Sequence, residues 1–355
     1  MAAAKAALVL TSGRGHDRSA LAAVRALATA GFRPVVGASG GDSLASASRY
    51  SAESCHLPDP GEPSFVEAVA SLATSTGAVA VFPSNDDALL ALDPGLDRLI
   101  DKSRLAEQAG AAGLLAPPTV TFPTAQDMVT AGMGVPYPAV IKPALKQAGL
   151  PPYTVQGPDQ IRTEEHRGPI IAQPFLDGVA DAICGVMWSG KLVASIRQEY
   201  IRTWPRACGT AAAAVVVPDD PVRSVALARL LAGYNGVFQA QFVEGALIDL
   251  NPRVYGSLPL AVGSGFNLPA LACQLAEGKP VASPPTAAGN RYRWIEGDIR
   301  NRWDAVRAGD ESLATALRDM TPHFDTSHSV FAMLDPGPTL APLRFAASGR
   351  KKGRA

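Results

Sequence analysis

The sequence has no excess of either charge. It carries 32 Lys and Arg residues against 32 Asp and Glu residues, so its formal net charge at pH 7 is zero. Recognition of a nucleic acid or an anionic membrane through a general electrostatic field needs a basic excess. The balance therefore argues against both of these partners and favours small molecules.

Cysteine is also scarce. The 4 cysteines, at positions 55, 184, 208 and 273, form no CxxC pair and are too scattered for the disulfide framework of a small secreted domain, so we expect free thiols. The 5 histidines have no spacing typical of a metal site. The apolar run in residues 1–10 is too short for a signal peptide or a membrane span. We therefore expect a cytoplasmic protein.

What is present is a long apolar chain, with 355 residues of which 47% are hydrophobic, and it predicts two or three domains. In residues 1–100, apolar strands at 7–11 and 78–82 alternate with helical patterns at 19–30 and 65–76. Such alternation favours a parallel sheet with right-handed crossovers. The sequence therefore predicts an N-terminal doubly wound α/β domain.

Gly13 and Gly15 follow the first strand and invite a dinucleotide-binding interpretation. Their spacing is not GxGxxG, and no acidic residue clearly closes the second strand. The alternative, in which these glycines only shape the turn, is favoured.

The pattern changes beyond residue 100. A helix is expected at 102–112, and later strands pair as hairpins with turns at Ser189-Gly190 and Glu244-Gly245. This predicts two α+β subdomains and a C-terminal extension whose basic end is disordered. The predicted units are 1–100, 101–170, 171–282 and 283–355.

The strongest chemical signal is Asp249-Leu250-Asn251-Pro252-Arg253, at the end of the last hairpin. Asp249 and Asn251 are two residues apart on a strand, so they project to one face. With Gln241 on the neighbouring strand, their oxygens can surround one or two Mg²⁺ ions that also take phosphate oxygens. Arg253 adds a bidentate donor for phosphate or carboxylate. A strand end with an Asx turn before proline is the alternative.

Together with other motifs, this segment resembles the ATP-grasp superfamily, in particular the predicted carboxylate-amine ligases related to the large subunit of carbamoyl-phosphate synthetase. The resemblance covers residues 7–280 and depends on the order and spacing of several short motifs. These are Ser48-Arg49-Tyr50, Leu57-Pro58-Asp59-Pro60, Phe82-Pro83-Ser84-Asn85-Asp86, Asp101-Lys102, Val140-Ile141-Lys142-Pro143, Gln173-Pro174-Phe175-Leu176-Asp177-Gly178 and Asn251-Pro252-Arg253-Val254-Tyr255-Gly256-Ser257-Leu258.

The resemblance implies a pre-ATP-grasp domain followed by two ATP-grasp subdomains that clasp ATP and Mg²⁺. It also implies that ATP converts a small carboxylate to an acyl phosphate, which an amine attacks to give an amide. Family lysines that bind ATP phosphates match Lys102 and Lys142, and the adenine-binding segment matches Gln173, Phe175 and Leu176. Lys142 lies in an apolar strand, where a bound anion would explain a costly cation; a snorkelling edge lysine is the alternative.

An arginine-rich segment surrounds Trp204-Pro205, where related sequences also carry arginines. Converging arginines would stabilise a transferred phosphoryl group and hold a substrate carboxylate. A solvated loop would explain Arg202 and Arg206 equally well. We assign Arg197 and Arg253 to catalysis, and Arg202, Arg206, Tyr255 and Ser257 to the substrate pocket.

Three features depart from the family pattern. Asp249 replaces the usual Glu, residues 143–152 contain only Gly149 where a glycine-rich loop is usual, and Gly209 stands where two glycines are expected. Two alternatives stay open: a nucleotide-binding protein that has lost turnover, and a ligase that activates bicarbonate or carbamate. The sequence does not identify the acid or the amine, and it leaves a homodimer open.

Overall fold

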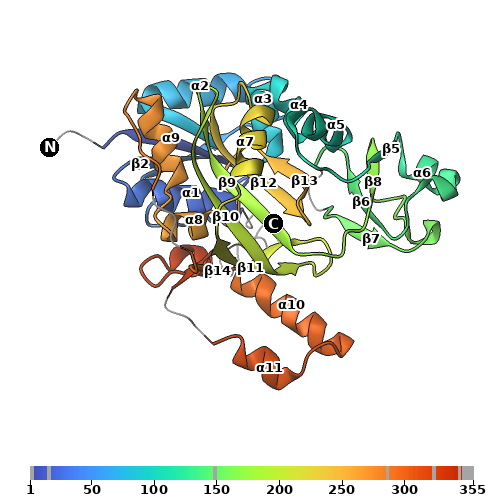
Figure 1. The fold of residues 1–355 in the computed structure, drawn as a ribbon. Helices are drawn as coiled ribbons and strands as arrows, with labels where there is room; N and C mark the ends of the chain where they lie inside the picture. Colours follow the sequence, from blue (N-terminus) through green and yellow to red (C-terminus); the bar gives the residue numbers. More distant parts are fainter. Residues whose placement is uncertain are drawn as a thin grey trace, which may run out of the picture.

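The fold is built on three β-sheets (Figure 1). The computed structural model describes residues 4–13, 17–146, 150–284, 288–321, 325–342 and 345. Within these residues, the strand orders are β3-β2-β1-β4, β13-β12-β9-β10-β11-β14-β15 and β5-β8-β6-β7. None of the described helices is long and apolar enough to cross a membrane.

The first sheet is parallel, and helices cover both of its faces. Ala7 and Val9 of β1 share a core with α1, whereas Leu8 packs with Phe65 of α2. Burial on both faces explains the uninterrupted apolar run of β1, and the expected α/β region with a parallel sheet is confirmed. The elements are β1 (Ala6–Thr11), α1 (Arg18–Thr29), β2 (Arg33–Ser39), β3 (Glu53–Leu57), α2 (Phe65–Thr76) and β4 (Ala78–Pro83).

The central sheet is mainly antiparallel. Ser189 and Glu244 adopt positive φ values of 47° and 50° ahead of a glycine, which is the geometry of tight hairpin turns. Both expected hairpins are therefore present. The strands are β9 (Ala180–Trp188), β10 (Lys191–Trp204), β11 (Thr210–Val217), β12 (Gly236–Val243), β13 (Ala246–Asn251), β14 (Arg291–Arg293) and β15 (Thr326–His328).

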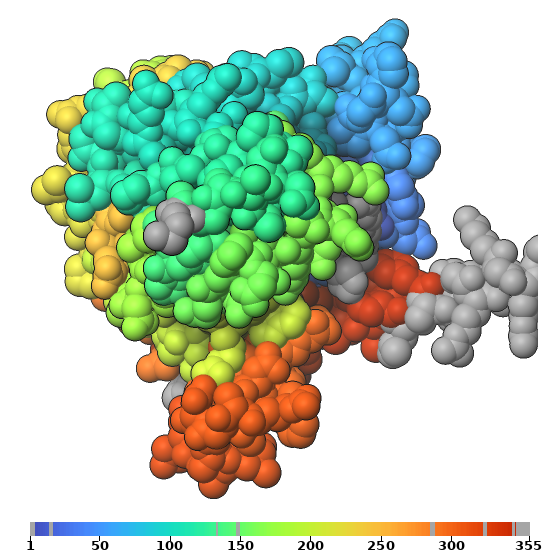
Figure 2. All heavy atoms as spheres, turned by 90° about the vertical axis from the view of Figure 1, so that its right-hand side faces the viewer, coloured from blue at the N-terminus to red at the C-terminus, as the bar shows by residue number. Residues whose placement is uncertain are grey.

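Strands β14 and β15 lie in residues 283–355, which the sequence analysis treats as a C-terminal extension. β14 pairs antiparallel with β11, and β15 pairs parallel with β14. This part of the chain therefore completes the central sheet. Helices α10 (Ile295–Ala308) and α11 (Leu313–Arg318) lie between these strands in sequence and project from the body, in orange in Figure 2.

The third sheet is small and lies to one side of the central sheet (Figure 1). The segment between α5 and β5 contacts the central sheet, where Leu247 N of β13 donates a hydrogen bond of 2.7 Å to Leu115 O. The elements of this region are α5 (Lys102–Ala112), β5 (Val120–Phe122), α6 (Ala125–Ala131), η2 (Gly132–Gly134), β6 (Ala139–Pro143), β7 (Tyr153–Val155), η3 (Pro158–Gln160) and β8 (Ile170–Pro174).

The remaining helices hold the first and central sheets together. α1 packs on α8 and α9, so that Leu27, Tyr255 and Phe266 belong to one core that spans both sheets. Asp220 caps α7 by accepting a hydrogen bond from Arg223 N, as the Asp220-Pro221 pair predicts. These elements are α3 (Asp86–Leu92), η1 (Pro94–Leu96), α4 (Asp97–Ile100), α7 (Pro221–Leu230), α8 (Leu258–Gly263) and α9 (Leu268–Ala276).

Candidate active site

The β12–β13 hairpin presents four polar side chains on one face. Its register places Gln241 opposite Asp249 and Gln239 opposite Asn251. Asn251 Nδ2 donates to Asp249 Oδ2 at 3.2 Å, and Gln241 Nε2 donates to Gln239 Oε1 at 3.1 Å. The structure therefore brings together Gln241, Asp249 and Asn251, the three residues that the sequence groups as metal ligands.

Two buried lysines approach this hairpin from different elements. Lys102 begins α5, where Asp101 caps the helix by accepting a hydrogen bond from Ser103 N. Lys102 Nζ lies 3.2 Å from Asp249 Oδ1. Lys142 lies on β6, and its Nζ donates a hydrogen bond of 2.7 Å to Ile248 O. The first residue of a helix and a strand of the small sheet thus each place an ammonium group against β13 of the central sheet.

The charges of this cluster depend on one another. Burial raises the pKa of Asp249, but the nearby cations Lys102, Lys146 and Lys142 outweigh it and lower this pKa to about 2. Burial lowers the pKa of Lys142 to about 8, although Asp249 opposes the shift. Asp249 is therefore ionised at neutral pH, and Lys142 remains mainly protonated there.

An apolar cleft lies between the small sheet and β12–β13, with the two lysines and Asp249 in its wall. Gln173, Phe175 and Leu176 line it, together with Val140, Phe242 and Ile248 from the facing strands. Phe175 N donates to Pro138 O at 2.8 Å, which holds this segment against β6. The volume of the apolar cleft, about 120 Å³, is below the ~300–1,000 Å³ of typical ligand pockets.

A second cavity, of about 170 Å³, is polar and adjoins the first, because Tyr200 and Gln241 line both. Arg253, Tyr255 and Ser257 line this second cavity. The sequence predicts a catalytic role for Arg253 and a place in the substrate pocket for Tyr255 and Ser257. Arg253 is buried, and its guanidinium bonds Asp86 and, at 2.7 Å, Asn251 Oδ1.

The structure does not bring Arg197, Arg202 and Arg206 to either cavity. Alternation along β10 turns Gln198 and Tyr200 toward the site and Arg197 away from it. The arginine side chains instead form ion pairs elsewhere. Arg197 pairs with Asp181 at 2.6 Å, Arg202 with Asp298, and Arg206 with Asp310 at 2.7 Å.

Several residues of the polar cavity are absent from the sequence-based set, namely Asp17, Arg18, Lys146, Tyr200 and Gln239. Two signals could have found some of them. Tyr200 is on the face of β10 opposite to Arg197, and Lys146 lies four residues beyond Lys142, in the segment that follows β6. Asp17 and Arg18 begin α1, and nothing in the local sequence marks them as part of a site formed with β12 and β13.

The glycines that the sequence singles out have separate outcomes. Gly13 has φ of 65°, and a Cβ there would lie 2.4 Å from Ser39 O, which supports a turn-shaping role. Gly209 lines the apolar cleft. Gly15 and Gly149 lie outside the described residues.

The residue types at the hairpin, one carboxylate and two amides, suit a magnesium ion. Asn251 turns its amide nitrogen to Asp249 and its Oδ1 to Arg253, so its amide group would have to turn over to bind the ion. Asp249 Oδ1 is buried and lacks a well-aligned hydrogen bond, and the amide side chains of Asn251 and Gln241 lie beside it. Mg²⁺ needs only one or two carboxylates when waters and substrate phosphates complete its shell. In the part of the chain that the structure describes, no three His, Cys, Asp or Glu side chains form a metal site. Of the three residues grouped at the hairpin, Asp249 is the one carboxylate.

Comparison with solved structures shows that the chain has the ATP-grasp fold, which it shares with several solved ligases and carboxylases. Carboxyaminoimidazole ribonucleotide synthase of Aspergillus clavatus, solved with ATP, has a TM-score of 0.60 and 15% identity, covering 82% of this chain and 81% of that one. The L-amino acid ligase of Bacillus licheniformis has a TM-score of 0.59 and 14% identity, covering 82% and 80%. Biotin carboxylase of Campylobacter jejuni, solved with β-γ-ATP, has 0.58 and 15%, covering 81% and 74%.

Sequence comparison points to a particular relative. The carbamoyl phosphate synthase large chain of Vibrio vulnificus is 24% identical over 208 residues, which cover 53% of this chain. Those residues cover only 19% of that much longer relative. No family model matches the chain.

Proposed function

We propose that this protein is an ATP- and Mg²⁺-dependent ligase that joins a small carboxylate to an amine through an acyl phosphate. The observation that carries the proposal is the meeting of two chemically different cavities at Tyr200 and Gln241. One is apolar with two lysines, and the other is polar with Lys146 and Arg253. A reaction between a nucleotide and a second, charged substrate needs this kind of junction.

The apolar cleft suits a nucleotide. Phe175 and Leu176 would pack on the adenine, and the main chain of the same segment would meet its edge. Lys102 and Lys142 would neutralise the phosphates, for which a compact ammonium is a suitable partner. Bound Mg²⁺ would supply charge neutralisation at the transferred phosphoryl group, held by Asp249, Asn251 and Gln241.

The polar cavity suits the carboxylate. Arg253 is held by Asp86 and Asn251 within reach of both Asp249 and the cavity, so it would orient the acid and stabilise negative charge during transfer. Lys146 lines the same cavity, and Arg253 is the main cause of its lowered pKa, with burial second. An anion bound between these two cations would relieve their repulsion. Burial of Arg253 would also limit the access of water to an acyl phosphate held there.

The lone carboxylate of the metal site supports a second candidate, a nucleotide-binding protein without turnover. Asp249 is shorter than the glutamate that the resemblance leads one to expect, and its neighbours are amides. This candidate keeps the same roles for Lys102, Lys142 and the adenine segment. It differs only in the chemical step.

Magnesium-dependent ADP release over a panel of amino acids, small carboxylates and bicarbonate separates these candidates. We expect release that requires an acid and an amine and that falls at least about 100-fold in Asp249→Asn, as for loss of a strong electrostatic contact in a transition state. Asp304→Asn, an exposed change on α10, is the matched control. Nucleotide binding without ADP release across the panel would favour the candidate without turnover. Release with bicarbonate alone would identify a bicarbonate-activating ligase.

A further inference from the structure

A separate cavity of about 440 Å³ is lined by β10, β11 and β14 and by the end of α11, and it shares no lining residue with the proposed nucleotide cleft. Its lining includes four arginines, Arg202, Arg291, Arg293 and Arg318, and one acidic residue, Asp319. We call it the arginine cavity.

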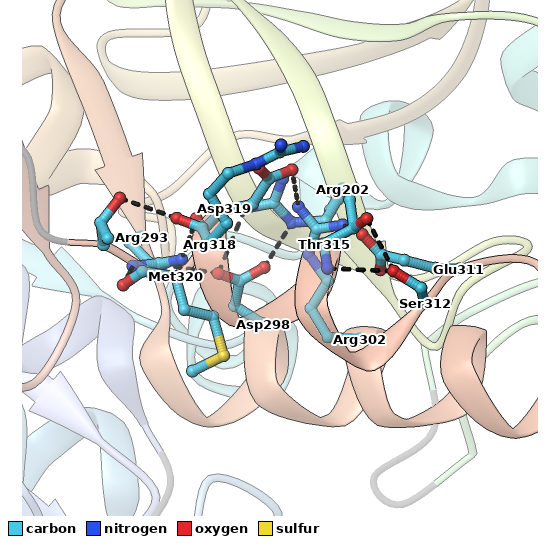
Figure 3. A network of polar contacts seen from close by, with 11 residues as sticks. Arg202, Arg293, Asp298, Arg302, Glu311, Ser312, Thr315, Arg318, Asp319 and Met320 are labelled. Atoms are coloured by element: carbon cyan, nitrogen blue, oxygen red, sulfur yellow. Dashed lines mark hydrogen bonds and ion pairs between the residues drawn. The ribbon is translucent and has the colours of Figure 1, made fainter.

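Two of the four guanidiniums share a single carboxylate (Figure 3). Arg202 Nη2 lies 3.2 Å from Asp298 Oδ2, and Arg293 Nε lies 2.5 Å from the same oxygen. Asp298 is completely buried behind them. One negative charge therefore compensates two positive ones, and the buried carboxylate fixes the position of both arginines.

The acid in the cavity wall is already engaged by another cation. Arg302 Nη2 lies 2.9 Å from Asp319 Oδ2, whereas Arg318 Nε lies 3.7 Å from Asp319 Oδ1 (Figure 3). Arg293 donates to the main-chain carbonyls of Asp319 and Met320, each at 2.9 Å. Carbonyls supply no formal charge, so these bonds leave the positive excess unchanged.

Arg291 adds a further positive charge that no carboxylate in the described part of the chain compensates. Its side chain forms no ion pair within the described residues, and it lines the cavity from β14, between β11 and β15. Within this cluster, the arginines outnumber the carboxylates, even when the Arg302–Glu311 pair is included. The chain has no net charge, yet positive charge is concentrated around the arginine cavity, which is large enough for a small ligand.

We propose that the arginine cavity is a binding site for a small anion that carries phosphate or carboxylate groups. The planar guanidinium fork matches both groups and forms two parallel hydrogen bonds with either. Arg202 and Arg293 are held in place by Asp298, while Arg291 and Arg318 are free to turn toward the ligand. The site is independent of the proposed ligase chemistry, because none of its residues lines the apolar cleft or the polar cavity.

Isothermal titration calorimetry on the full chain tests this site with inorganic phosphate and with citrate, at constant ionic strength set by NaCl. We expect saturable binding of at least one probe. Arg291→Gln combined with Arg318→Gln should weaken it by at least about tenfold, since charge-assisted bonds are the strong ones. Both side chains are exposed, so the variant should keep its circular dichroism spectrum.

Two controls make the result specific. Arg307→Gln removes an exposed arginine of α10 that does not line the cavity, and it should leave binding unchanged. Lys142→Ala should also leave binding unchanged, because it alters only the proposed nucleotide cleft. Binding of phosphate alone would assign a phosphorylated ligand, and binding of citrate alone a polycarboxylate. The absence of binding by both probes, or binding that survives the double substitution or is lost in Lys142→Ala, would overturn the proposal.

Discussion

Lys142 is a buried cation whose ammonium group bonds a main-chain carbonyl. The carbonyl of Ile248 carries no formal charge, so it compensates the lost hydration of the lysine only in part. This is why burial is the main cause of its lowered pKa. A phosphate would supply the missing negative charge. The burial of Lys142 therefore supports the proposal that it binds a phosphate group.

Lys142→Met tests that interpretation because it keeps the length of the apolar stem and removes the charge. We expect ATP affinity to fall by about 10- to 100-fold, corresponding to a charge-assisted hydrogen bond of about 1.5–3 kcal/mol. The free energy of unfolding without nucleotide should change by less than about 1 kcal/mol, since a buried charge is also removed. Titration calorimetry and urea unfolding give the two values. Equal ATP affinity in the variant and in exposed Lys191→Met would refute the phosphate role.

Asp86 forms a buried pair with Arg253 that links α3 to the end of β13. Burial raises the pKa of Asp86, but Arg253, Lys146 and Lys102 together bring it below its ordinary value of 3.8. A carboxylate with a lowered pKa in the folded state stabilises the fold above the unfolded pKa. Its contribution disappears as the pH falls through the folded pKa.

Asp86→Asn should therefore lower the free energy of unfolding by about 3 kcal/mol at pH 7, because it leaves Arg253 buried without its partner. The difference from the wild type should persist at pH 5 and shrink below about pH 4, because the carboxyl of the unfolded chain takes up a proton there before that of the folded protein. Urea unfolding at pH 7, 5 and 3 measures it, with Asp304→Asn as the exposed control. A difference that does not depend on pH would show that packing, and not charge, is lost.

At the scale of elements, β10 contributes to both of the proposed sites. Gln198 and Tyr200 face the proposed active site, whereas Arg202 reaches the arginine cavity. Register shifts in the β10–β11 ladder between Tyr200 and Thr203 allow this change of direction near the hairpin tip. The same tip carries Cys208 and Gly209 into the wall of the apolar cleft.

Gly209→Ala should disturb this hairpin tip. A Cβ at Gly209 would lie 2.0 Å from the main-chain carbon of Trp204, a contact that only a backbone shift can relieve. We expect a loss of stability of about 1–3 kcal/mol, similar to the cost of other local backbone strain, and weaker nucleotide binding. Thermal unfolding and calorimetry check both effects. Gly190→Ala is not a matched control because of its positive φ, so Gly110→Ala, which has open space around it, serves instead.

At the scale of the whole molecule, the small sheet and the central sheet form opposite walls of the proposed nucleotide cleft. Lys142 and Gln173 come from one wall, and Asp249 and Phe242 from the other. The enclosed volume of about 120 Å³ is too small for ATP by comparison with the ~300–1,000 Å³ of ordinary ligand pockets. Nucleotide entry should therefore require the small sheet to move outward.

Hydrogen exchange tests this opening. Addition of ATP and Mg²⁺ should slow amide exchange in β6 and β8 of the small sheet, because a bound nucleotide would join the two walls. Exchange in β1 and β2 of the first sheet should change little, which provides an internal control. Mass spectrometry after timed exchange would show the difference. Equal slowing in all three sheets would indicate general stabilisation without closure.

Local sequence was enough to predict much of the fold and part of the candidate site. The turn at Glu244-Gly245 predicts the hairpin and pairs Val243 with Ala246 and Phe242 with Leu247. An irregularity between Gln241 and Phe242, which the sequence does not announce, then brings Gln241 opposite Asp249. The alternation of strands and helices likewise predicted the parallel sheet. The cytoplasmic location, a homodimer and the division into domains stay predictions.

Only the tertiary structure decided which cations meet which anions. Arg202 bonds Asp298, 96 residues later, and Arg18 bonds Tyr292, 274 residues later. Charge alone made Arg197, Arg202 and Arg206 look alike, but the pleat of β10 and the packing of α10 direct them away from the proposed active site. Period and spacing determine the face that a side chain occupies within its own element. The partner on another element depends on how the sheets and helices pack, because long-range contacts follow from the folded core and not from neighbouring residues.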